Sequence, residues 1–270
     1  MEPSPIFDLD AYFARIGYTG PREPTLATLH AIVRHHTATI PFENLDVLLG
    51  HRIQLDPASL QKKLIHDRRG GYCFEQNGLL LLVLEALGYR VTPLSARVRW
   101  QRPRDFTPPR THLFLRVELN GESWIADVGV GGVSPTCALG FIESVVQTTP
   151  HDQRRFVHED GRWFHQVNFG AEWLDVSEFT LEEMPLIDRE LANWFTSTHP
   201  QSHFKDKLIV ARAGENGTRL SLLNHDLTTR TRDGRSVVHR LVSPDELLAA
   251  LLQEFGLRLP PEIRFPLPGA

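Results

Sequence analysis

Two glycines and a cysteine stand directly before the most apolar segment of this chain. Gly70 and Gly71 precede Cys73, and the segment Leu79 to Leu87 that follows is mostly leucine. This run predicts a buried helix that begins near the cysteine and ends at Gly88, because glycine is typical just after the last turn of a helix. The free N–H groups and the dipole of a first helical turn favour a thiolate. Cys73 is therefore a candidate nucleophile.

The hydrophobic period changes after Gly88, from helical spacing to the alternation of strands. We expect helices over residues 8–16, 26–33, 58–65, 73–87, 185–195 and 244–255. We expect strands over residues 90–100, 112–119, 123–128, 154–159, 163–169, 172–178, 208–212, 219–223 and 227–232. The middle third predicts a small antiparallel barrel or curled sheet, since its short strands are separated by turns. The proline-containing tail, residues 259–270, is expected to be extended.

Composition excludes several kinds of partner. The 270 residues carry a net charge of −4. The sequence contains no run of basic residues that would bind nucleic acid or an anionic membrane. The first ten residues lack a secretory signal, so we expect a cytoplasmic protein whose two cysteines are reduced thiols. No CxxC pair occurs, so we predict no metal site, although thirteen histidines leave one formally open. The sequence does not predict the oligomeric state.

A hairpin supplies partners for the thiol. Asn120-Gly121 is a typical hairpin turn, His112 begins the strand before it, and Asp127 ends the strand after it. The two strands must be neighbours, so His112 and Asp127 should lie at the same open end of the pair. A cysteine nucleophile needs a base, and the base needs a group that orients it. Each residue alone has an ordinary structural reading, but together they predict a catalytic triad of Cys73, His112 and Asp127.

Five sequence blocks resemble the arylamine N-acetyltransferase family. In chain order they are PFENLDV at residues 41–47, RGGYCFEQN at 69–77, RTHL at 110–113, DVGVGG at 127–132 and TSTHPQSHF at 196–204. The resemblance covers nearly the whole chain and implies the same triad, Cys73, His112 and Asp127. It also implies an α+β fold with three regions: a helical bundle with the nucleophile (1–88), an antiparallel β-barrel with the histidine and aspartate (89–184) and an α/β lid (185–270). The catalytic core would be similar to that of a cysteine protease.

The resemblance further implies a ping-pong acetyl transfer. The donor would be acetyl-CoA as co-substrate, with no metal or prosthetic group, and Cys73 would carry the acetyl group. The acceptors would be arylamines, arylhydrazines or N-hydroxyarylamines, which places the activity in xenobiotic metabolism. Substrate or CoA contacts are implied for Phe42, Thr111, Gly129, Val130, Gly131 and Phe204. The family commonly has phenylalanine at position 130, so Val130 should widen the acceptor pocket and remove a ring-stacking surface.

Other functions remain open at this level. The same triad serves cysteine amidohydrolases, and an amide synthase that takes an acyl chain from a carrier is a close variant of the transferase. A non-catalytic binding protein could also keep the fold, but the complete triad disfavours it. The physiological acceptor, the acyl-chain range and the role of Cys137 are not determined by the sequence. Trp100 and Trp194 are interpreted as core aromatic residues.

Overall fold

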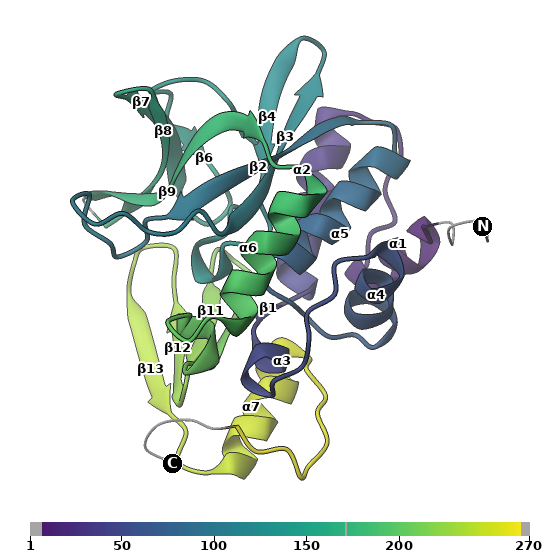
Figure 1. Ribbon diagram of the computed structural model, residues 1–270, viewed down its shortest axis with the longest axis vertical. Helices are drawn as coiled ribbons and strands as arrows, with labels where there is room; N and C mark the ends of the chain where they lie inside the picture. Colours follow the sequence, from purple (N-terminus) through teal and green to yellow (C-terminus); the bar gives the residue numbers. More distant parts are fainter. Residues whose placement is uncertain (1–6, 171, 266–270) are drawn as a thin grey trace.

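The computed structural model describes residues 7–170 and 172–265, so the end of the tail that we expect to be extended lies outside the described residues. Helices and two antiparallel sheets make up the fold (Figure 1). The α-helices are α1 (Leu9–Ile16), α2 (Leu26–Thr39), α3 (Leu45–Leu48), α4 (Pro57–Leu60), α5 (Cys73–Ala86), α6 (Leu186–Thr198) and α7 (Pro244–Phe255). A π-helical segment, η1 (Gln61–His66), continues α4, and two short 3-10 helices are η2 (Gly131–Val133) and η3 (His203–Lys205).

The helix ends follow local capping chemistry. The Asp8 side chain accepts from Ala11 N at the start of α1, and the Ser243 side chain does the same for Glu246 N in α7. The helix expected over residues 26–33 continues to Thr39, which the apolar period did not show. Its last turns bury His36 and Thr37, which are polar but hydrogen-bonded, so burial continues without a hydrophobic pattern.

The larger sheet has the order β5-β4-β3-β2-β9-β8-β7-β6. Its strands are β2 (Arg90–Val98), β3 (His112–Leu119), β4 (Glu122–Ala126), β5 (Leu139–Gly140), β6 (Gln147–Thr148), β7 (Gln153–Glu159), β8 (Arg162–Phe169) and β9 (Glu172–Glu183). The two edge strands nearly close the sheet into a barrel: the Gln147 amide accepts from Gly140 N at 2.7 Å and donates to Gly140 O at 2.8 Å. The predicted α+β fold with an antiparallel barrel is thereby confirmed.

The second sheet has the order β1-β10-β11-β12-β13. Its strands are β1 (Phe42–Glu43), β10 (Ile209–Ala213), β11 (Arg219–Leu223), β12 (Asp226–Arg230) and β13 (Ser236–Arg240). The sequence analysis missed β1 and β13, because β1 has two residues and β13 is exposed at every position and so has no buried face. β1 lies in the predicted helical region yet pairs with β10 of the predicted lid. The region boundaries at 88/89 and 184/185 stay predictions.

Helix α5 lies at the centre of the molecule. Its middle, from Leu79 to Leu84, is apolar on every side, as expected for a buried helical segment, and it packs between α1, α2 and the outer face of β3 and β4. Leu80 and Leu84 are fully buried in this cluster with Leu115 and Val117 of β3. The packing therefore holds the first residue of α5 against the end of the barrel, where β3 begins and β4 ends.

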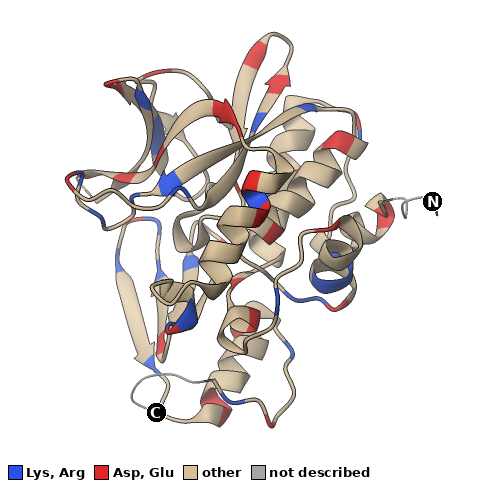
Figure 2. Cartoon of the chain, viewed as in Figure 1, with Lys and Arg blue, Asp and Glu red and all other residues tan. Residues whose placement is uncertain are grey.

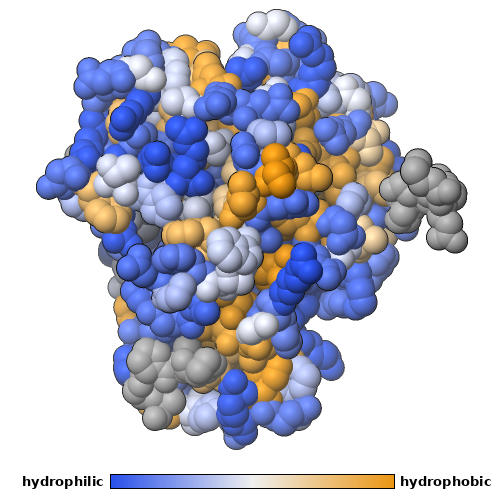
Figure 3. Space-filling view, viewed as in Figure 1, coloured by the Kyte–Doolittle hydropathy of each residue, from blue (hydrophilic) through white to orange (hydrophobic). Residues whose placement is uncertain are grey.

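Large hydrophobic side chains remain exposed on α6. They are Leu186, Ile187, Leu191 and Trp194. Orange residues also gather near the centre of the face shown in Figure 3. The interpretation of Trp194 as a core residue is wrong, because the side chain is 63% exposed. Charged residues are spread over the molecule, with Lys and Arg along the strands of the second sheet (Figure 2).

Candidate active site

The nucleophile stands at a tightly constrained helix start. Cys73 is the first residue of α5 and is 5% exposed. The two glycines before it are required by close approach: a Cβ on Gly70 would lie 2.0 Å from the Pro41 carbonyl oxygen, and one on Gly71 would lie 2.7 Å from Glu75 Oε2. The same Glu75 oxygen accepts from Tyr72 N at 3.0 Å. The N-terminus of α5 is therefore fixed by its own third residue.

A partly buried charge network supports this helix start. Lys63 Nζ bridges Glu75 Oε1 at 2.6 Å and Asp46 Oδ2 at 2.7 Å. Arg69 donates to Glu43 Oε1 at 2.8 Å and to Asp46 Oδ1 at 3.2 Å. Burial and the Lys63 charge oppose each other at Glu75, and burial prevails, so the pKa of this carboxyl is raised. These contacts give Arg69 and Glu75 a structural role, because both hold the backbone around the nucleophile through ion pairs and hydrogen bonds.

The predicted base and its orienting acid are in direct contact. His112 Nε2 and Asp127 Oδ2 are 2.7 Å apart, and both side chains are almost completely buried. Burial lowers the pKa of His112, but the Asp127 charge, the hydrogen bond to Asp127 and the Cys73 side chain raise it to about 10. Burial alone would raise the pKa of Asp127, whereas the His112 charge and three hydrogen bonds lower it. The pair therefore favours imidazolium beside carboxylate.

Asn77 joins the helix to the hairpin, and the sequence analysis gave it no role. Its Nδ2 donates to Asp127 Oδ1 at 3.0 Å and to the Leu113 carbonyl at 2.6 Å, while its Oδ1 accepts from Val128 N at 3.0 Å. A polar residue four positions after Cys73, just before the run of leucines, was the available signal, because residues i and i+4 share a helix face.

The thiol lies against the residue before the base. Cys73 Sγ donates to the Thr111 carbonyl at 3.5 Å. Gly129 also packs closely against the cysteine, because a Cβ there would lie 2.7 Å from Cys73 Cα. His112 Nε2 is occupied by Asp127, so Nδ1 is the nitrogen left to take the thiol proton. An imidazolium beside a cysteine favours the thiolate. The three predicted residues thus form one constellation built from a helix and a hairpin.

The other predicted contact residues divide into two groups. Phe42 and Phe204 share an apolar cluster with Cys73, and their rings are 6.1 Å apart. Gly131 belongs with them, because a Cβ there would lie 3.7 Å from the Phe42 ring. Val130 packs instead in a separate cluster with Trp100. Val130 thus belongs to a different apolar cluster from the one that contains the thiol, and its contact with substrate stays a prediction.

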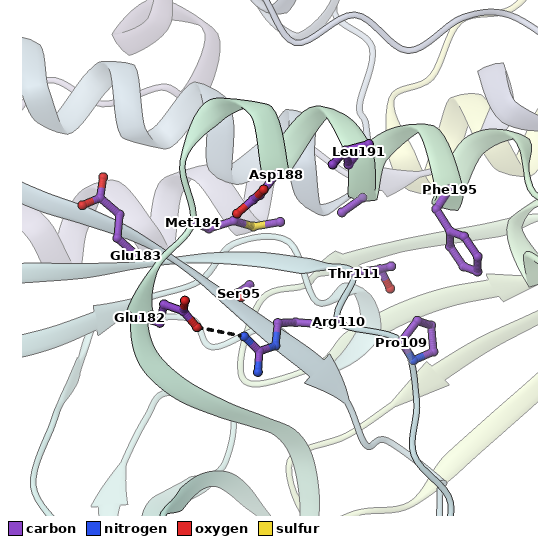
Figure 4. Close-up of a pocket in the computed structure, with 11 residues that line it drawn as sticks. Ser95, Pro109, Arg110, Thr111, Glu182, Glu183, Met184, Asp188, Leu191 and Phe195 are labelled. Atoms are coloured by element: carbon purple, nitrogen blue, oxygen red, sulfur yellow. Dashed lines mark hydrogen bonds and ion pairs between the residues drawn. The ribbon is translucent and has the colours of Figure 1, made fainter.

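A pocket of about 380 Å³ adjoins the thiol through shared residues (Figure 4). Thr111 lines it, and so do Met184 and Ala192, which belong to the Cys73 cluster. In the described parts of the chain, no group of histidine, cysteine, aspartate or glutamate residues could hold a metal ion. Within those same residues, no helix is long and apolar enough to cross a membrane.

Comparison with known proteins identifies the family. A family model described as N-acetyltransferase matches residues 25–264. The arylamine N-acetyltransferase of Escherichia coli K12 is 43% identical over 250 residues, which span 92% of this chain and 88% of that protein. The chain belongs to the arylamine N-acetyltransferase family. The enzyme of the same name from Mycobacterium tuberculosis is 40% identical over 93% of this chain and 90% of its own length.

Solved N-acetyltransferase structures share the fold as well as the sequence. The Mycobacterium tuberculosis arylamine N-acetyltransferase superimposes with a TM-score of 0.89 at 40% identity, over 92% of this chain and 93% of that one. The Mycobacterium marinum enzyme, solved in complex with CoA, gives a TM-score of 0.89 at 38% identity, over 92% of each chain. The predicted resemblance is thus confirmed by both sequence and structure.

Proposed function

We propose that this protein transfers the acetyl group of acetyl-CoA to the nitrogen of arylamines and arylhydrazines, and to the oxygen of N-hydroxyarylamines, through an S-acetyl intermediate on Cys73. The observation that carries the proposal is the constellation of thiol, imidazole and carboxylate at the start of α5, in a chain of this family. One relative, from Salmonella typhimurium, is named as both an arylamine N-acetyltransferase and an N-hydroxyarylamine O-acetyltransferase.

In the first half-reaction, the proton of Cys73 passes to His112, and the thiolate attacks the acetyl carbonyl carbon. The C–S bond to CoA then breaks, and the CoA sulfur leaves with the pair of electrons and takes up the proton. The oxyanion needs donors, and the first N–H groups of α5, including that of Cys73, have no acceptor within the helix. Asp127 keeps the imidazole oriented and stabilises its positive charge.

In the second half-reaction, the acceptor nitrogen attacks the same carbonyl and the Cys73 thiolate leaves. His112 takes the proton that the nitrogen loses, so the enzyme returns to its starting state. A thioester suits this exchange, because thiolate is both a good nucleophile and a good leaving group. We assign Phe42, Phe204 and Gly131 to the acyl and acceptor pocket and Thr111 and Gly129 to the walls beside the thiol. Val130 would affect the acceptor pocket only indirectly, because it packs in a separate apolar cluster together with Trp100.

Intact-protein mass spectrometry tests the first half-reaction. Incubation with acetyl-CoA should add one acetyl group, which Cys73→Ala should not acquire and which an added arylamine should remove. The matched control is Cys137→Ala, which should acetylate like the wild type. Release of free acetate in the presence of arylamine, with no acetylated amine formed, would establish a hydrolase instead. Labelling by an acyl-carrier thioester but not by acetyl-CoA would establish an amide synthase.

A further inference from the structure

The glycine loop, residues 128–134, follows the aspartate of the proposed triad and contacts both the nucleophile and the acceptor pocket. A Cβ on Gly129 would lie 2.7 Å from Cys73 Cα, and one on Gly131 would lie 3.7 Å from the Phe42 ring. Gly131 has a φ of +78°, which residues with a side chain rarely adopt. The position of this loop therefore sets one wall of the space in which the acceptor meets the acetyl group.

Two arginines hold the far end of the glycine loop through its backbone carbonyls. Arg219 Nη1 donates to Ser134 O at 2.9 Å and to Gly132 O at 3.5 Å. Arg154 Nη2 donates to Val133 O at 2.8 Å. Arg154 belongs to β7 of the barrel, whereas Arg219 belongs to β11 of the second sheet. Three successive carbonyl groups are thus held from two sheets at once.

Asp152 joins the two arginines. Its Oδ1 accepts from Arg154 Nε at 2.6 Å, and its Oδ2 accepts from Arg219 Nη2 at 2.6 Å. All three side chains are almost completely buried. Burial opposes ionisation of Asp152, but the charges of the two arginines prevail and hold its pKa well below the usual range. Burial lowers the pKa of Arg219 to about 10, so this residue is still a cation at neutral pH.

The buried charges do not cancel. Two cations share one carboxylate, and Arg230 pairs directly with Arg219 in the register of β11 and β12, which adds a third, partly buried cation. A buried ion cluster is often no more stable than apolar residues of the same volume, so stability alone does not explain it. The carbonyl dipoles of the glycine loop offset the excess positive charge only while the loop keeps its place. The cluster therefore favours one position of the loop over all others.

The sheet that carries Arg219 also carries the opposite wall of the acceptor pocket. Phe42 of β1 pairs with Ala211 of β10, and Ala213 of β10 pairs with Arg219 of β11. Gly132 packs on the same sheet, because a Cβ there would lie 3.9 Å from Ala211 Cβ. Arg219 thus connects the glycine loop to the sheet that positions Phe42.

We propose, on the basis of the acetyl transfer proposed above, that Arg219 is a positioning residue for the acceptor. Together with Asp152 and Arg154 it fixes Gly131 against Phe42, so that the ring of an aromatic acceptor is held for the second half-reaction. It acts through the backbone of the glycine loop rather than on the substrate. An acceptor without a ring does not use this wall, and its reaction with the acetyl-enzyme does not depend on Arg219.

Phenylhydrazine and hydrazine test the positioning, because they offer the same nucleophilic nitrogen with and without a ring. The measurement is the second-order rate constant at which each removes the acetyl group from preformed acetyl-enzyme, followed by intact-protein mass spectrometry. Arg219→Met leaves Asp152 paired with Arg154, so the remaining buried pair is balanced. We expect the ratio of the phenylhydrazine to the hydrazine rate constant to fall about tenfold in Arg219→Met, because a small displacement of a binding wall lowers the rate strongly.

The variant should still form the acetyl-enzyme, because the contacts of Asp127 with Asn77 and with Gly129 N at the start of the loop are unchanged. The rate constant for hydrazine should also stay close to the wild-type value. A general loss of structure would instead lower acetyl-enzyme formation and both rate constants together, and that result would overturn the proposal.

Two further variants separate position from charge. Arg212→Met is the matched control, because Arg212 lies in the same sheet but donates to the carbonyls of Glu254 and Ala38. It should keep the wild-type ratio. Arg219→Lys keeps the charge beside Asp152 but lacks the planar fork that reaches two acceptors at once, so it should show most of the loss. An unchanged ratio in Arg219→Met, an equal fall in Arg212→Met or full recovery in Arg219→Lys would overturn the proposal.

Hydrogen exchange examines the glycine loop without any acetyl transfer. Ser134 N donates to Gly131 O at 2.9 Å, and this amide should exchange about tenfold faster in Arg219→Met than in the wild type or in Arg212→Met. If the wild type forms no acetyl-enzyme while this exchange rises, the proposed function fails and the role of Arg219 in holding the loop stands. If acetyl transfer proceeds and the exchange is unchanged, the positioning proposal alone is overturned.

Discussion

His112 Nε2 and Asp127 Oδ2 are 2.7 Å apart although the two residues are not directly opposite in the hairpin. Leu115 pairs with Ala126, so the register places Asp127 opposite Phe114 and diagonal to His112 on the same face. Diagonal neighbours are within reach of long side chains. The Phe114 ring lies parallel to the imidazole, at 5° with centroids 6.2 Å apart, and limits its rotation. The hairpin register thus brings the base and its acid within hydrogen-bonding distance.

Asp127→Asn tests the charge of the Asp127 carboxylate separately from the size of its side chain. The amide keeps the size of the side chain but removes the charge that raises the pKa of His112. We expect formation of the acetyl-enzyme to slow by about 10²- to 10⁴-fold. Single-turnover mass spectrometry measures this rate, with Asp175→Asn elsewhere in the barrel as the control. A rate within threefold of the wild type would remove Asp127 from the mechanism.

The pKa of His112 predicts a pH dependence of stability. The folded pKa of about 10 is above the unfolded value of about 6.5, so the stabilisation is complete below about pH 6.5 and is lost as pH rises towards 10. Denaturant unfolding of the wild type and of His112→Gln should therefore give curves that converge between these limits. A difference that stays constant or grows with pH over that window would contradict the assignment.

Gly129→Ala tests the contact between the glycine loop and the nucleophile. The added Cβ would lie 2.7 Å from Cys73 Cα and 2.7 Å from Asn77 Nδ2, so the start of α5 must move. We expect about 1–3 kcal/mol of destabilisation and about a 10²-fold loss of activity from misalignment. Gly132→Ala is the matched control, because its nearest neighbour would be Ser221 Cβ at 3.8 Å. Equal effects at the two positions would show that loop flexibility, not the close approach, is what matters.

Lys63→Met tests the charge network under the nucleophile. Its loss leaves Glu75 and Asp46 without the cation that bridges them, which should cost about 3–5 kcal/mol of unfolding free energy. Lys62→Met removes an exposed partner of Asp67 and should cost at most about 1 kcal/mol. Equilibrium urea unfolding compares the two. Adding Glu75→Gln to Lys63→Met should recover part of the lost unfolding free energy. A further decrease in stability would argue against the ion pair between Lys63 and Glu75.

Local rules accounted for much of the fold. The bounds of β3 and of α7 follow from a turn and a cap: Asn120-Gly121 ends the first, and Ser243 with Pro244 begins the second. The pairing of β1 with β10 was not predictable, because it joins residues distant in the sequence. Trp194 was assigned to the core because an aromatic residue in a helix carries no local sign of which face is covered.

The sequence by itself determined the parts of the site that are close along the chain. A hairpin turn brings His112 to Asp127, and two glycines before Cys73 mark a backbone that must approach its neighbours closely. Only the tertiary structure decided how these parts meet. Burial of α5 against β3 and β4 places Cys73 beside Thr111, and Asn77 joins the helix to Asp127. The physical reason is that apolar packing between distant segments has no local signature, whereas turns and caps are encoded in a few adjacent residues.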